Sequence, residues 1–69
     1  AVARSEASSN REMIERVLEA EERTIQNYVE RMKQAEEFGD YGLANDLQEI
    51  ISDETRHKEE CEKLLRGVA

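Results

Sequence analysis

Residues 35–65 read AEEFGDYGLANDLQEIISDETRHKEECEKLL, and this stretch decides the fold. Gly39 is the residue type that most often follows a helix C-terminus, because it adopts a left-handed backbone without strain. Asp40 is a preferred N-cap, since its carboxylate accepts a hydrogen bond from the first turn of the next helix. Two long helices joined by so few residues must run antiparallel. The stretch therefore predicts a helical hairpin.

Apolar residues recur at steps of three, four and seven on both sides of this turn, as they do on amphipathic helices. Before the turn they are Ile14, Val17, Leu18, Ile25, Tyr28, Met32 and Ala35, and after it Leu43, Leu47, Ile50, Ile51, Cys61, Leu64 and Leu65. Ser9 and Glu12 fit a capping box at the start of the first helix. We therefore predict helices over about 10–38 and 41–66, preceded by a flexible N-terminal arm over residues 1–9.

The size of the chain limits how it can be stabilised. It has 69 residues, no proline and a single cysteine, Cys61. A chain this short is at most one domain and rarely buries enough apolar surface without a disulfide, a metal or a partner. One cysteine cannot form an intrachain disulfide, so a metal or a partner remains. Because nothing covers the far side of a lone hairpin, we predict an all-α fold in which two hairpins dimerise into a four-helix bundle.

The formal net charge of -7 narrows the choice of partners. An acidic surface argues against nucleic acid and against anionic membranes, and it suits a protein that attracts cations, although solubility alone also explains it. No apolar run has the length needed to span a bilayer, and no secretory signal segment is visible. Together with one reduced cysteine, these features predict a cytoplasmic protein.

Three polar residues interrupt the predicted apolar stripes: Glu21 in the first helix, and Glu54 and His57 in the second. Each has mainly apolar neighbours three, four and seven residues away, which places it on or near the buried face. At about 1.5 Å of rise per residue, all three lie roughly 22–28 Å from the turn and so come level inside the hairpin. Carboxylates and an imidazole are costly to bury together, and such a cost indicates a metal or chemistry.

A second copy of the chain would add the same three residues and bring four glutamates and two histidines to one point. Di-iron and di-manganese carboxylate bundles use this ligand set, with one glutamate from each of two helices and Glu-x-x-His from each of the others. Oxygen-rich ligands with one imidazole per metal suit iron or manganese and tolerate zinc. Glu-x-x-His is weak evidence alone, since fourteen of the 69 residues are glutamate. In the alternative interpretation, Glu54 and His57 lie at a solvated end of an ordinary hairpin.

The residues of this argument also resemble a known family. Their order along the chain is Glu21, Tyr28 and then Asp53-Glu54-x-x-His57. This order is similar to one half of a ferritin-like di-iron domain, and most similar to the second helix pair of bacterioferritin. The likeness covers most of the chain beyond the N-terminal arm and needs no gap between the first glutamate and the Glu-x-x-His motif.

This resemblance implies iron binding and oxidation of Fe(II) by O₂ or peroxide, with two metal ions per dimer. By position, Glu21 would be a terminal ligand, Glu54 a bridging carboxylate and His57 an imidazole ligand. Asp53 would accept a hydrogen bond from a histidine and orient it, in particular the histidine of the partner chain. Tyr28 would be a neighbouring hydroxyl or a redox-active side chain, and an ordinary core tyrosine is the other interpretation.

The chain departs from the family in carrying one helix pair where members carry two. The missing ligands must come from a second copy, or from another half of a longer protein. No methionine lies beside the Glu-x-x-His motif, so we expect no haem. A rubrerythrin-like peroxide reductase would need an iron–sulfur site that Cys61 alone cannot supply, and this cysteine is better interpreted as a small core residue than as a soft ligand. A non-catalytic dimerising hairpin, with at most a structural metal, is the alternative from another functional class.

Overall fold

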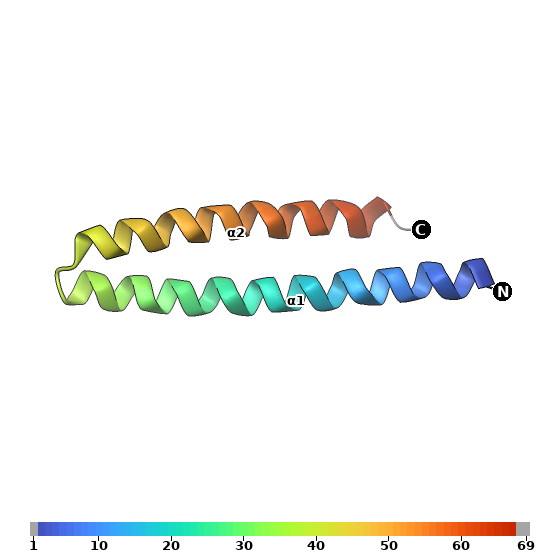
Figure 1. The fold of residues 1–69 in the computed structure, drawn as a ribbon, viewed down its shortest axis with the longest axis horizontal. Coiled ribbons are helices and arrows are strands. Elements are labelled where there is room, and N and C mark those ends of the chain that lie inside the picture. The colour runs from blue at the N-terminus through green and yellow to red at the C-terminus, as the bar shows by residue number, and fades with distance from the viewer. Residues whose placement is uncertain (1, 68–69) are drawn as a thin grey trace.

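In the computed structural model, which describes residues 2–67, the chain forms two antiparallel helices joined by a short turn (Figure 1). Helix α1 spans Val2–Glu37 and helix α2 spans Tyr41–Gly67. The hairpin is a rod of 57 × 14 × 11 Å. Residues 2–67 contain no strand. The prediction of an all-α hairpin is therefore confirmed, and no helix within this range is long and apolar enough to cross a membrane.

The turn follows the capping chemistry that the sequence predicts. Gly39 has a positive φ of 78°, and its N–H donates to the carbonyl of Glu36 at 3.0 Å. The N–H of Asp40 donates to the carbonyl of Ala35 at 2.8 Å, which completes a Schellman motif. The Asp40 carboxylate then accepts from the N–H of Leu43 at 3.1 Å, as an N-cap does. Two adjacent residues thus end one helix and begin the next.

The start of α1 differs from the prediction. The helix begins at Val2 rather than near residue 10, so Ser9 and Glu12 lie inside it instead of capping it. Residues 2–9, predicted as an arm, are helical, while Ala1 lies outside the described residues. The physical reason is that this segment holds alanine, arginine and glutamate, which favour helix, and neither proline nor glycine to stop it. The other three helix ends agree with the prediction to within one residue.

The two helices meet along a seven-residue repeat that alternates steps of three and four, the pattern of a coiled coil. We call these half-buried or buried positions the seam. The seam comprises Ile14, Leu18, Glu21, Ile25, Tyr28, Met32 and Ala35 of α1 with Ala44, Leu47, Ile51, Glu54, Lys58, Cys61 and Leu65 of α2. Among side chains 9–67, the only buried apolar residues are the three seam members nearest the turn, Ala35, Ala44 and Leu47. The hairpin therefore closes tightly at its turn and stays open to solvent along the rest of its length.

A second stripe on α2 faces solvent. Leu43, Ile50, His57 and Leu64 follow one another at intervals of seven residues, and all four are exposed. The three apolar members have exposed fractions of 48%, 37% and 59%. We call this set the open stripe. Large apolar side chains aligned on one exposed face are a feature of interaction surfaces.

Candidate metal centre

Glu21, Glu54 and His57 reach one point from the two helices. Glu54 lies midway between Tyr41 and Gly67, the two ends of α2, and it occupies a seam position opposite Glu21 of α1. The middle of a long helix is its least frayed part, so the interpretation of a solvated helix end does not describe this site. Because α2 has 3.6 residues per turn, His57 follows Glu54 by just under one turn and stands at the edge of the seam.

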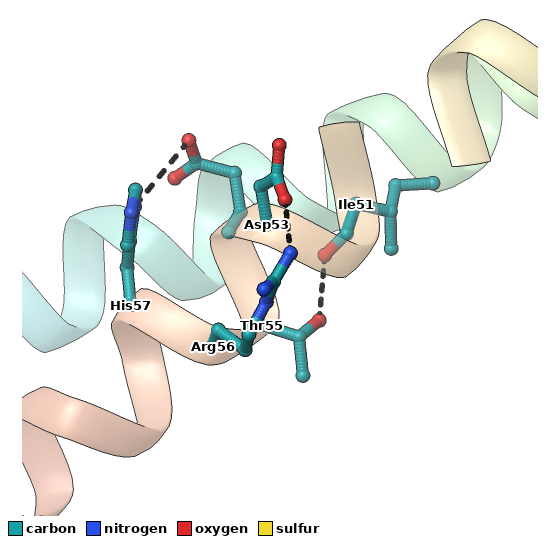
Figure 2. A network of polar contacts seen from close by, with 6 residues as sticks. Ile51, Asp53, Thr55, Arg56 and His57 are labelled. Carbon is teal, nitrogen blue, oxygen red and sulfur yellow. Dashed lines mark hydrogen bonds and ion pairs between the residues drawn. The ribbon is translucent and has the colours of Figure 1, made fainter. Parts of the chain in front are cut away.

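The three side chains form a compact set of ligand atoms. One oxygen of Glu21, one oxygen of Glu54 and one ring nitrogen of His57 all lie within 4.8 Å of one another. The dashed line from His57 in Figure 2 marks its contact with Glu54, where Nδ1 lies 4.0 Å from Oε1. The prediction from helix rise, that these three side chains lie at the same distance along the hairpin, is therefore confirmed. Two carboxylates and one imidazole are the donors that iron, manganese and zinc accept.

The Glu21 carboxylate is the member of the set in the least favourable surroundings. Its Oε2 atom is buried and has no hydrogen-bond partner. The pKa of the Glu21 carboxyl is raised above 4.5, and the largest cause is hydrogen bonding with Glu54, which requires a proton between the two carboxyls. Burial and the negative charge of Glu54 raise this pKa further, while the charge of His57 lowers it. An acceptor without a donor beside a second carboxylate is a costly arrangement that a bound cation would satisfy. The residues therefore fit a metal.

Comparison with known proteins agrees with this geometry. The family model described as ferritin-like domain matches residues 1–69, which is the whole chain. The chain belongs to the ferritin-like family. Neither a curated protein nor a solved structure gives a significant match. The match thus establishes the family, while the likeness to bacterioferritin in particular stays a prediction.

His57 departs from the sequence interpretation, which placed it on the buried face of its helix. In this ferritin-like chain its side chain is 59% exposed, whereas that of Glu54 is 24% exposed. The reason is its register, since His57 lies seven residues from both Ile50 and Leu64 and shares their solvent-facing side. The metal group therefore has a half-buried carboxylate side within the seam and an open imidazole side.

Asp53 and its neighbours make only local contacts in the single chain. The Asp53 carboxylate pairs with Arg56, and both side chains are exposed (Figure 2). The Thr55 hydroxyl donates to the carbonyl of Ile51 at 2.7 Å and so is satisfied by its own helix. The predicted role of Asp53 concerns a histidine of a partner chain, and it stays a prediction.

Two further residues singled out from the sequence lie in the seam. Tyr28 is half-buried on α1, seven residues beyond Glu21. Cys61 is a free, half-buried thiol on α2, and it is not a member of the metal group found among the described residues. Its placement agrees with a small core residue. The suggested role of Tyr28 beside the metal stays a prediction.

Sequence reasoning missed Lys58. This residue occupies a seam position one turn beyond Glu54, and its Nζ lies 3.6 Å from Oε1 of Glu22 on the other helix. The signal was the seven-residue repeat, because position 58 falls between 54 and 61 in the alternation of three and four. Selecting apolar residues alone passes over a lysine, although its long methylene stem packs readily against apolar surface.

Proposed function

We propose that two copies of this ferritin-like chain complete a di-metal carboxylate centre that binds iron and oxidises Fe(II) with O₂ or peroxide. The observation that carries the proposal is the convergence of Glu21, Glu54 and His57 within 4.8 Å, with a buried oxygen of Glu21 left without a partner. A buried carboxylate oxygen without a hydrogen bond is stabilised neither by water nor by a protein donor. A divalent cation supplies the missing positive charge and the missing bonds.

The incompleteness of the site supports a second copy. One chain offers three ligand residues, and two chains offer four glutamates and two histidines, which is the ligand set of a pair of metal ions. His57 is the one polar member of the open stripe, so whatever covers Leu43, Ile50 and Leu64 also covers the imidazole. A homodimer, or a larger assembly of dimers, would both cover the open stripe and supply the missing ligands. Another half of a longer protein would serve in the same way.

Each residue then has a distinct task. Glu54 would bridge the two ions, Glu21 would bind one ion terminally from the opposite helix, and His57 would supply the single imidazole. Asp53 would accept a hydrogen bond from the partner's imidazole and fix its orientation. Tyr28 would stand as a hydroxyl neighbour.

Iron is the metal we propose, with manganese and zinc as the alternatives, and no haem. A pair of iron ions supplies two electrons to O₂ or peroxide when both are bound as Fe(II). The chain contributes a half-buried seam that limits access of water to Glu21 and Glu54, whose side chains are partly shielded. In a ferroxidase reaction Fe(II) is the substrate and Fe(III) the product.

A second function is favoured by the open stripe itself. Leu43, Ile50 and Leu64 would drive association of two hairpins whether or not a metal binds. In that case the protein is a non-catalytic dimerising hairpin, and a redox-inert ion such as zinc at Glu54 and His57 would be structural only. The two functions differ in their response to Fe(II) and oxygen.

The deciding experiment is anaerobic titration with Fe(II), followed by exposure to O₂. For the wild type we expect two Fe(II) bound per dimer and oxidation faster than in buffer. Glu54→Ala should lose both properties, while the matched control Glu49→Ala, an exposed glutamate on the same helix, should retain them. Metal binding without accelerated oxidation would leave the structural role as the correct one. A wild-type chain that sediments as a monomer with and without metal would refute the shared site.

A further inference from the structure

Lys58 is a charged residue in a position that the seam repeat reserves for apolar side chains. It is the one cation among the half-buried or buried side chains of residues 9–67. Its side chain is 33% exposed, and its ammonium group lies 3.6 Å from the Glu22 carboxylate across the helix interface. Lysine is seldom buried unless it is paired. Its placement therefore calls for a reason at this level of the hairpin.

The reason lies in the charges around it. Glu54 precedes Lys58 by four residues, which is the spacing at which a helical glutamate and lysine attract one another. Glu22 is the neighbour of Glu21, so the Lys58–Glu22 contact joins the two helices at the level of the metal group. The ammonium group thus pairs with Glu22, which is next in sequence to Glu21, and Lys58 follows Glu54 by about one helical turn. The Glu22 side chain is 53% exposed, so solvent screens this pair in part, while the half-buried Lys58 stem holds its charge close to the seam.

We propose that Lys58 is a positioning residue that holds the metal-free site together and lowers its affinity for metal. As a fixed counter-cation, it offsets the repulsion between Glu21 and Glu54 and sets the register of α1 against α2 before a metal arrives. The same positive charge repels an incoming divalent ion. This inference rests on the proposed metal centre, and it adds that the ion is held loosely enough to be exchanged.

The pairing also gives Glu22 a defined place. Its carboxylate follows Glu21 directly in sequence, yet it does not belong to the metal group found among the described residues. Held against Lys58, it is kept from competing as a further ligand. Lys58 thereby restricts the site to the two glutamates and one histidine that converge.

The test compares three variants of the full chain at a concentration where the wild type is dimeric. Lys58→Met removes the charge and keeps an unbranched side chain, Lys58→Arg keeps the charge, and Lys63→Met removes an exposed lysine from the same helix. The probe is Mn(II), measured by calorimetry in oxygen-free buffer, and the metal-free melting temperature is measured separately in chelator.

We expect Lys58→Met to melt at a lower temperature without metal and to bind Mn(II) on the order of tenfold more tightly, because one like charge has been removed beside a divalent ion. Lys58→Arg and Lys63→Met should match the wild type in both measurements. A purely structural lysine would not raise metal affinity when removed. If Lys58→Met fails to fold without metal, Lys58→Gln provides the same comparison with a polar side chain.

The outcomes separate this inference from the proposed function. If the wild type binds Mn(II) and Lys58→Met binds it no more tightly than Lys63→Met, the role of Lys58 is refuted and the metal centre stands. If Lys58→Met melts at a higher temperature than the wild type, the counter-cation role is refuted, because the seam then simply prefers an apolar residue. If the wild type binds no metal ion at all, the proposed function and this inference both fail.

Discussion

Replacing Glu21 with leucine is expected to stabilise the metal-free protein. Glu21 occupies a seam position, its Oε2 atom is buried without a hydrogen-bond partner, and Glu54 faces it. Leucine removes the unsatisfied oxygen and the repulsion, and it adds apolar surface to a seam that is otherwise mostly apolar. Replacing buried ionic groups by well-packed apolar residues ranges from neutral to stabilising by about 1–4 kcal/mol.

The half-burial of Glu21 reduces this figure, because solvent already screens part of the repulsion. We expect a gain of about 1–2 kcal/mol, which for a domain of this size raises the melting temperature by roughly 4–16 °C. Thermal unfolding in the presence of a chelator, followed by far-ultraviolet circular dichroism, measures the change. The same substitution should abolish stabilisation by Fe(II) or Mn(II), because a ligand has been lost.

Glu19→Leu is the matched control, since it makes the same exchange at an exposed position of the same helix. Surface substitutions of this kind usually change stability by less than about 0.5 kcal/mol. Glu21→Gln separates the two contributions, because it removes the charge and keeps the shape. A melting temperature for Glu21→Leu equal to or below that of Glu19→Leu would show that Glu21 is not strained in the metal-free chain.

Four other predictions follow from the same structure. Because the folded pKa of Glu21 is raised above 4.5, its carboxyl binds protons more strongly in the folded state. Its contribution to metal-free stability is therefore greatest below about pH 4.5 and is lost as the pH rises through the folded pKa. Unfolding in urea at a series of pH values measures this dependence, and Glu21→Gln should lack the part that comes from Glu21. Glu54→Ala should abolish the rise in melting temperature that Mn(II) gives the wild type, whereas an unchanged rise would exclude Glu54 as a ligand. Leu64→Glu, in the open stripe, should shift sedimentation from dimer to monomer, unlike Lys63→Glu beside it. Gly39→Ala should cost about 1 kcal/mol in chemical unfolding, because φ at this residue is 78° while the space around it is open.

The turn could be predicted from the sequence because its chemistry is local. Gly39 and Asp40 each carry one well-defined capping preference, and both hydrogen-bond patterns involve residues no more than five positions away. The start of α1 could not be predicted in this way. Ser9 is a suitable N-cap, but no residue before it prevents the helix from starting earlier. A capping signal marks where a helix is able to begin, and a breaker decides whether it does.

The metal group could be predicted because helix rise is constant, so positions far apart in sequence are placed at one level by counting from the turn. The direction of His57 could not be obtained in that way. Apolar neighbours at helical spacing occur both in the seam and on the open stripe, and only the packing of α1 decides which stripe is covered. The sequence therefore indicated which residues converge, while the structure separated the side of α2 that faces α1 from the side that faces solvent.

The two stripes of α2 explain how such a short chain can hold a costly site. Within the seam, placing the Glu21 carboxylate beside Glu54 opposes folding of the metal-free hairpin, and the few buried apolar residues near the turn offset this cost. On the open stripe, Leu43, Ile50 and Leu64 retain apolar surface whose burial would stabilise an assembly rather than the lone chain. Because His57 belongs to the open stripe, the proposed partner and the proposed metal act on the same side chain. Association would then favour metal binding, and metal binding would favour association by the same free energy.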